Sequence, residues 1–182
     1  MATVSLSLDE IYKLANKTLL TNGCDQETAD ILSELITNAE RDGSLSHGLF
    51  RLPAYVSGLK SGKINGKQKP DIKKLTPSVI KADGKNCLAP VVLNKSIPEL
   101  VKAAKENGVA VLAIINSHHM AAMWPETEKI AEEGLVAFAC TSYKPAVAPA
   151  GAIKPLFGTN PISFDWPRKN NTPVVYDMAT AS

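Results

Sequence analysis

The hydrophobic pattern of this 182-residue chain changes its period once, close to residue 78. Before that point, apolar residues recur every three or four positions, which is typical of amphipathic helices that pack on a common core. After it, they occur in short runs rich in β-branched residues, which is typical of buried strands. The sequence therefore predicts a mixed α/β (α+β) protein. A helical region over residues 1–78 is followed by a mostly buried mixed sheet with flanking helices over residues 79–182.

Two N-terminal helices carry start and stop signals. Ser7 and Glu10 have the spacing of a capping box, and Gly23 stops the first apolar stripe. Asp25 can cap a second helix, which keeps the same period up to Gly43. Amphipathic helices have to bury their apolar faces, so we expect a packed helical layer at the start of the chain.

The second region contains alternating strand and helix patterns. The seven apolar residues "VAVLAII" (109–115) predict a central strand covered on both faces. A short helix over 125–133 and a strand over 135–141 follow, and this order predicts a crossover with parallel pairing. Further strands are predicted over 78–84, 162–166 and 174–178.

Two segments between these elements lack a regular period. Residues 61–77 are rich in Gly, Lys and Pro and look like an exposed connection. Residues 142–161 form a Pro/Gly-rich loop that is long for a connector, which makes it a candidate binding loop. A helix that ends at Asn107 begins at Pro90 or at Pro98, because either proline suits a first helical turn.

Composition and charge exclude several classes of protein. A net charge of +2, evenly spread, does not suggest a nucleic-acid surface or a polybasic membrane patch. The sequence shows no N-terminal signal pattern and no apolar stretch long enough for a membrane span. The three cysteines are far apart and never form a C-x-x-C pair, which argues against a disulfide framework or a zinc site. We therefore expect a soluble cytoplasmic protein with no nucleic-acid, membrane or metal partner.

Two of the three histidines, His118 and His119, are adjacent and follow the predicted strand over 109–115. Open α/β sheets bind ligands at the carboxyl ends of their strands, so this pair is a candidate for catalysis. Adjacent residues point to opposite sides of an extended chain, so at most one of the two is expected to face a cleft. The alternative is a histidine that only hydrogen-bonds a loop carbonyl.

A second candidate cluster lies in "SLSHGLFRLPAY" (44–55). If this segment is helical from His47, then His47, Arg51 and Tyr55 share one face. An imidazole can transfer a proton near neutral pH, and a guanidinium can hold a carboxylate by two parallel hydrogen bonds. These groups are the ones needed to reduce a 2-oxo acid, whose carboxylate must be held while its alkoxide oxygen is protonated.

The sequence leaves alternatives open in this segment. Pro53 would kink a helix that began at Ser46, so the helix could instead begin near Leu49, with His47 on its entry loop. Taken singly, the arginine is as easily a solvated charge and the tyrosine a core residue.

No familiar nucleotide-binding motif is present. Neither G-x-G-x-x-G nor G-x-x-x-x-G-K-[ST] occurs, so the sequence predicts neither a Rossmann fingerprint nor a P-loop. Asp177 follows the apolar run "PVVY" at the end of a predicted strand, where its carboxylate could accept hydrogen bonds from a ribose or a nicotinamide group. From spacing alone, a turn or a helix cap is an equally good interpretation.

Five stretches of the chain, in this order, resemble the malate/L-lactate dehydrogenase family that lacks the Rossmann fold. That group includes ureidoglycolate, sulfolactate and diketogulonate oxidoreductases and the piperideine-2-carboxylate reductases. The resemblance runs over nearly the whole chain, and the stretches are "RDGSLSHGLFRLPAYVSGLKSGKI", "ADGKNCLAP", "AIINSHHMAAMWP", "PLFGTNPISF" and "YDMATAS".

The resemblance implies a dimeric oxidoreductase that uses NAD or NADP, bound by a fold of its own, to interconvert 2-hydroxy and 2-oxo acids, or cyclic imino acids. It implies that His119 transfers a proton and that His47 is a second candidate proton donor. It implies substrate contacts at Arg51, Tyr55, Thr159 and Asn160, and cofactor contacts at Ser142, Asp177, Met178 and Ala179.

Members of this family are longer and continue past the stretch that matches "DMATAS". We therefore expect either a fragment of an enzyme or a truncated product, and the alternative to catalysis is a half-chain that acts as a dimerisation or binding module. A metallohydrolase built on His47, His118, His119 and Asp177 is disfavoured. Adjacent histidines rarely bind one metal, and no H-x-x-x-H spacing occurs.

Overall fold

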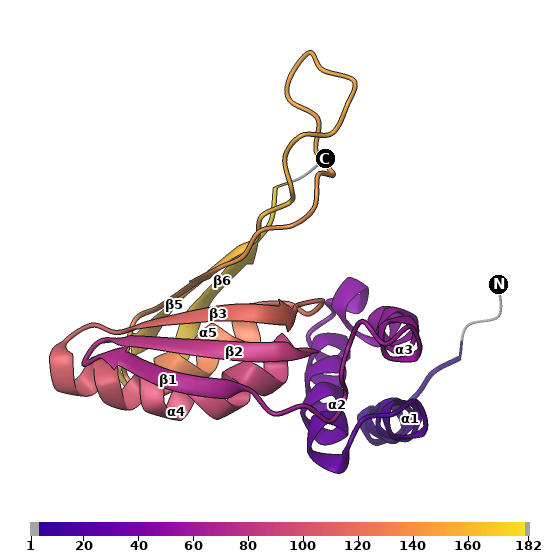
Figure 1. Ribbon diagram of the computed structural model, residues 1–182, viewed down its shortest axis with the longest axis horizontal. Helices are drawn as coiled ribbons and strands as arrows, with labels where there is room; N and C mark the ends of the chain where they lie inside the picture. The colour runs from indigo at the N-terminus through magenta and orange to yellow at the C-terminus, as the bar shows by residue number, and fades with distance from the viewer. Residues whose placement is uncertain (1–3, 181–182) are drawn as a thin grey trace. The chain divides into compact units, whose positions relative to one another are not determined.

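The computed structural model describes residues 4–180. The chain divides into two compact units, Met1–Ala121 and Ala122–Ser182 (Figure 1). The first unit combines several helices with a three-stranded sheet and the second combines the helix over Trp124–Glu132 with another, so the predicted mixed α/β class is confirmed. The division proposed at residue 78 falls inside the first unit and stays a prediction.

The first unit begins with the two predicted helices, α1 (Leu8–Thr21) and α2 (Gln26–Arg41). The capping box is present, because the Glu10 amide donates to Ser7 Oγ at 3.3 Å and the Ser7 amide donates to Glu10 Oε2 at 2.8 Å. At the start of α2, the amide of Thr28 donates to Asp25 Oδ1 at 2.9 Å. Each cap satisfies backbone groups that a helix end leaves unpaired.

Two short 3₁₀ turns, η1 (Leu45–His47) and η2 (Leu49–Arg51), precede α3 (Leu52–Lys60). Pro53 lies in the first turn of α3, where the missing N–H costs no hydrogen bond. The helix thus starts after His47, and the alternative with His47 on the entry segment is the correct one.

The three helices share one hydrophobic core with the end of the sheet. Its buried members are Ile11, Ala15, Leu19, Cys24, Ala29, Leu32, Ile36, Leu52, Tyr55, Ile64, Leu88 and Val91. Met120 packs against the same core from the segment that follows the last strand of this unit.

The sheet of the first unit has the order β1-β2-β3. β1 (Asp71–Thr76) pairs antiparallel with β2 (Val79–Leu88), and β2 pairs parallel with β3 (Val111–His118). Helix α4 (Ala89–Asn107) connects β2 to β3. It starts with Pro90 in its first turn, carries Pro98 inside, and ends at Gly108 with a positive φ of 80°. β2 and β3 both run toward the helical layer (Figure 1).

Two predictions about this sheet are wrong. β3 is an edge strand with Val111 55% exposed, whereas "VAVLAII" predicted a central strand covered on both faces. The run is apolar on both sides, although only one side is packed within the described chain. β1 lies inside the predicted connection 61–77, and its lysines concealed a strand whose outer face is charged.

The second unit contains α5 (Trp124–Glu132) and the strands β4 (Ala137–Cys140), β5 (Ile162–Arg168) and β6 (Asn171–Met178). The strands form an antiparallel sheet in the order β4-β5-β6. The predicted parallel crossover from 109–115 to 135–141 is therefore wrong, because β4 pairs with β5 in a different sheet. The parallel crossover occurs one step earlier, from β2 through α4 to β3.

The predicted long loop, residues 142–161, lies between β4 and β5. Val147 and Phe157 pair as an isolated antiparallel bridge that closes its outer part. Figure 1 shows it as the orange extension beyond the ends of β5 and β6.

Within residues 4–180, no helix combines the length and the apolar character that crossing a membrane requires. The same part of the chain gathers no group of three side chains suited to hold a metal ion.

Candidate functional site

The candidate residues fall into two groups, one in each unit. The histidines, Arg51 and Tyr55 belong to the first unit, and the candidate cofactor contacts belong to the second. Thr159 and Asn160, for which substrate contacts were predicted, lie with the second group.

His47 ends the turn η1, half-buried between two serines. Its Nδ1 lies 3.0 Å from Ser46 Oγ and 3.4 Å from Ser44 Oγ. A hydroxyl can donate to this ring nitrogen or accept from it, depending on the tautomer, and the contact orients the ring, as a proton-transferring imidazole requires.

The backbone after His47 is held by α2. The Leu49 amide donates to Glu40 Oε1 at 2.7 Å. Gly48 is buried against the same carboxylate, and a Cβ at this position would lie 2.2 Å from Glu40 Oε1. Glycine is therefore required while Glu40 keeps this bond, and the bond fixes the start of η2, which carries Arg51.

Arg51 has no ion-pair partner among the described residues, although other charged side chains on the same unit do. Its Nε–H is buried and donates to no acceptor in this part of the chain. The guanidinium lies 6.0 Å from the centroid of the Phe50 ring, within the range of a cation–π contact. A half-buried arginine with an unused donor suits a carboxylate ligand.

Tyr55 is fully buried in the core of the helical layer. This position agrees with the interpretation of Tyr55 as a core residue. A substrate contact of this side chain stays a prediction.

His118 is the last residue of β3, and His119 follows it directly. Both are half-buried, and His118 lies opposite Leu88 in the register of β2 and β3. Leu88 and Met120 pack on the core that also holds Leu52 and Tyr55. The strand end with the two histidines and the segment with His47 and Arg51 are thus built on one shared core.

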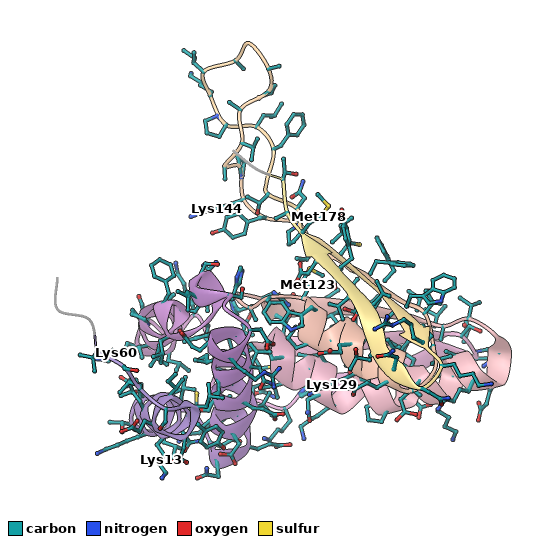
Figure 2. The ribbon with its side chains drawn as sticks, turned by 180° about the vertical axis from the view of Figure 1, so that it is seen from behind. Lys13, Lys60, Met123, Lys129, Lys144 and Met178 are labelled. Atoms are coloured by element: carbon teal, nitrogen blue, oxygen red, sulfur yellow. The ribbon has the colours of Figure 1, made fainter. Side chains whose placement is uncertain are left out.

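In the second unit, Asp177 caps α5. Its Oδ2 accepts the amides of Met123 at 2.8 Å and Trp124 at 2.9 Å, and Figure 2 labels Met123 at this helix start and Met178 at the end of β6. The carboxylate thus interacts favourably with the positive end of the helix dipole. Of the two interpretations of Asp177, the helix cap is what the structure shows. Contact with a cofactor stays a prediction.

The other candidates of this unit meet at the base of the loop. The Tyr143 amide donates to Asn160 Oδ1 at 3.1 Å, and the Thr180 amide donates to the Thr159 carbonyl at 2.8 Å. Gly158 makes this closure possible, because a Cβ there would lie 2.1 Å from the Tyr143 carbonyl oxygen. Ser142 and Ala179 are chain neighbours of these bonded residues, so the predicted cofactor contacts gather in one region.

A buried polar group on β5 was missed by sequence reasoning. Asp165 and Ser163 are fully buried, and Ser163 Oγ lies 2.7 Å from Thr127 Oγ1 of α5. No hydrogen bond of ordinary geometry from residues 4–180 reaches the Asp165 carboxylate. Burial raises the pKa of Asp165, although the Thr127 hydroxyl, the Tyr176 backbone and the Ser163 hydroxyl lie near enough to oppose the rise. Alternation in "ISFDW" was the available signal, but it does not say which side is covered.

Comparison with known proteins identifies related sequences. The model of a family described as malate/L-lactate dehydrogenase matches residues 6–182. The chain is 41% identical over 180 residues to a Δ1-pyrroline-2-carboxylate/Δ1-piperideine-2-carboxylate reductase of Pseudomonas syringae pv. tomato. The match covers 99% of this chain and 52% of that reductase.

Solved structures show the same similarity. The crystal structure of Δ1-piperideine-2-carboxylate reductase from Pseudomonas syringae matches with a TM-score of 0.91 and 42% identity, over 98% of this chain and 54% of that one. A malate dehydrogenase from Pyrococcus horikoshii OT3 matches with a TM-score of 0.90 and 32% identity, over 98% of this chain and 51% of that one. The chain thus spans about half the length of the relatives that it matches.

Proposed function

The chain belongs to the malate/L-lactate dehydrogenase family, and on this premise we propose that it serves a nicotinamide-dependent reduction of small acids with a C=N or C=O bond next to the carboxylate. The reductases that are 41% and 42% identical to it support cyclic imino acids as the first candidate substrates. The similarity to a malate dehydrogenase at 32% identity supports 2-oxo acids, reduced to 2-hydroxy acids, as the second.

The observation that carries the proposal is the state of Arg51. A guanidinium with a buried, unpartnered Nε and no ion-pair partner among the described residues leaves its charge available for an anion. Cyclic imino acids and 2-oxo acids both carry a carboxylate next to the reacting carbon. Arg51 would hold this carboxylate by charge-assisted hydrogen bonds and so orient the double bond.

Reduction of either bond also needs a proton. Hydride arrives at the carbon, and the proton goes to the imine nitrogen or to the carbonyl oxygen. His47 and His119 are the two candidate donors. The hydroxyls of Ser46 and Ser44 orient the His47 ring, while His119 follows directly after the end of a strand.

The second unit offers groups that fit NAD or NADP. Both cap bonds of Asp177 go to Oδ2 of a side chain that is exposed, so Oδ1 suits a hydroxyl or carboxamide donor of the cofactor. Ser142, Met178 and Ala179 lie at the same loop base and would contribute further cofactor contacts, while Thr159 and Asn160 beside them would contact the substrate. The bound nicotinamide would supply the hydride.

The test is steady-state reduction of Δ1-piperideine-2-carboxylate and of a panel of 2-oxo acids, with NADH and with NADPH. Replacing Arg51 by Met should lower kcat/KM by about 100-fold or more, because the substrate carboxylate loses its partner. Arg168→Met is the matched control, because Arg168 lies on β5 and donates to the Thr172 carbonyl at 2.7 Å. An Arg51→Met enzyme with unchanged kcat/KM would refute the assigned role.

The second candidate, a non-catalytic half-chain, rests on the coverage of about half of each relative. A stable dimer that does not bind NADH or NADPH in a fluorescence titration would favour it over catalysis.

A further inference from the structure

In the sheet β4-β5-β6, polar side chains lie on the face that a helix covers, and apolar side chains lie on the face that the described residues leave uncovered. Residues directly opposite each other on neighbouring strands share a face, so the register defines both faces. One row, Ala137, Asp165 and Val175, shares its face with Ser163 and Asp177. This is the face that α5 covers, through the contact of Thr127 with Ser163 and the cap formed by Asp177.

The opposite side, which we call the open face, carries uncharged and mostly large side chains in these rows, and the charged Arg168 follows only at the end of β5, beyond a register shift. Its members are Phe138, Cys140, Ile162, Phe164, Trp166, Val174, Tyr176 and Met178. Phe138 is 62% exposed and Trp166 54%. The Phe164 and Trp166 rings lie 6.2 Å apart, centroid to centroid, so the aromatic groups are contiguous.

An antiparallel sheet with one covered face normally directs its apolar residues to that face and its polar residues to water. Here the covered face contains a buried carboxylate, Asp165, and a buried hydroxyl, Ser163, which meets the buried hydroxyl of Thr127 on α5, while the aromatic rings point outward. A contiguous apolar surface of this kind marks an interaction site in a stable protein. We propose that the open face docks the polypeptide that corresponds to the remaining half of the reductase relatives.

The match with solved relatives points to this occupant. This chain aligns along 98% of its length with the Pseudomonas syringae reductase but accounts for only 54% of that chain, so those enzymes contain almost as much polypeptide again. β6 is an edge strand of the sheet and its last residue, Met178, belongs to the open face. Polypeptide that continues in the direction of β6 therefore starts beside this face.

The chemistry of the face sets what can bind. Eight uncharged residues offer no charged partner for an ion pair, so the docking segment should present aliphatic or aromatic side chains, as one side of an amphipathic helix or strand does. A charged side chain introduced into the centre of this face should prevent docking, because its burial would lack compensation.

Co-expression tests this proposal without cofactor or substrate, so its result does not depend on the proposed function. The 182-residue chain is produced together with an affinity-tagged second half of the Pseudomonas syringae reductase. Co-purification in equal amounts is the expected result. Trp166→Asp and Phe138→Asp should each weaken the complex by about 30-fold or more. Phe157→Asp is the matched control, because Phe157 is 52% exposed on the loop outside the sheet, and this variant should bind as the unchanged chain does.

If an aspartate variant does not fold, tryptophan fluorescence of a chain that keeps all the aromatic residues of the open face provides a second test. With Trp124 replaced by Phe, Trp166 is the remaining tryptophan, and its emission should shift to the blue and resist acrylamide quenching in the complex. Three results would overturn the proposal. These are no co-purification, full binding by the folded Trp166→Asp chain, and a self-associated chain that Trp166→Asp converts to a monomer, which would assign the face to a second copy.

Discussion

The two sheets place apolar residues on opposite sides relative to the helix that covers them. In the first sheet, one row faces the cluster that contains Val92 of α4, and the neighbouring row faces outward. The first row is Ile72, Ala82 and Ile114, and the second is Lys73, Lys81 and Ala113. In the second sheet, the row on the α5 side contains the carboxylate of Asp165, and the outward row consists of three aromatic residues, Phe138, Phe164 and Tyr176.

The first sheet thus has its apolar face covered within its own unit, whereas the apolar face of the second sheet is left uncovered by the described part of the chain. Burial of aliphatic side chains under α4 stabilises the first sheet by the hydrophobic effect within its own unit. Under α5, the second sheet instead buries polar groups, one of which lacks a hydrogen bond of ordinary geometry from residues 4–180. Its aromatic surface contributes stability only when something covers it. We therefore expect mutations in the two sheets to have different costs.

The largest effect should come from Ile80, which is fully buried on the middle strand of the first sheet. Ile80→Ala should lower the free energy of unfolding by about 2–5 kcal/mol, through lost burial and the cavity left behind. Phe164 lies at the corresponding place, on the middle strand of the second sheet, but it is 37% exposed. Phe164→Ala should therefore lower the free energy of unfolding by about 1 kcal/mol or less. Urea unfolding followed by circular dichroism measures both. Equal losses would contradict the difference between the sheets.

Substitution of Asp165 should give the next largest change in the free energy of unfolding, and this change should be an increase. Asp165→Asn removes a buried charge and keeps the side-chain size, so it should raise stability at pH 7 by about 1–3 kcal/mol. Because burial raises the pKa of Asp165, the folded state binds its proton more tightly than the unfolded state does. The unchanged protein therefore loses stability as the pH rises from about 4 through the folded pKa, and the Asn variant avoids this loss.

Unfolding experiments at several values between pH 4 and pH 7 test this sign. Asp83 of the first sheet is the control, because hydrogen bonds from the Lys85 backbone and the Asn116 side chain lower its pKa. The stability that Asp83 contributes is present above its unfolded pKa and disappears as the pH falls, so Asp83→Asn should be relatively most harmful at pH 7. If Asp165→Asn has its advantage at pH 4 instead, the carboxyl is not the destabilising group.

A smaller effect is expected at Asp177. Asp177→Ala removes the acceptor of two amides at the start of α5 and should cost about 1 kcal/mol, whereas Asp177→Asn keeps an acceptor oxygen and should cost less. Hydrogen exchange at the Met123 and Trp124 amides measures the local change. Unaltered protection of these amides in Asp177→Ala would mean that the cap does not hold the helix start.

Much of this fold could be predicted from local signals. The caps of α1 and α2, the end of α4 at Gly108 and the long loop all depend on residues that are close in sequence, whereas the sequence left the start of α4 open between Pro90 and Pro98. β1 was missed because its lysines suggested a solvated segment, and their covered neighbours become apparent only when β2 pairs with it. The edge position of β3 depends on which strands surround it, and a run of apolar residues carries no such information.

For the candidate site too, the sequence predicted the local features but not those that depend on packing. The sequence placed His118 and His119 at a strand end, and it identified the segment that holds His47 and Arg51. It could not decide that Tyr55 lies in the core, because burial depends on how α1 and α3 pack. The direction of Asp165 was equally hidden, since alternation in β5 gives two faces without saying which one meets α5.

The bridge between Val147 and Phe157 has a practical consequence for work on this protein. It separates the outer part of the loop, residues 148–156, from the base where Asn160 and Gly158 close on Tyr143. Gly151 lies in this outer part with no heavy atom within 4 Å of where a Cβ would be. An epitope tag or a small reporter domain inserted there should be tolerated, since no strand pairing or cap would have to rearrange. The loop tip is thus the place to attach a label for following this chain.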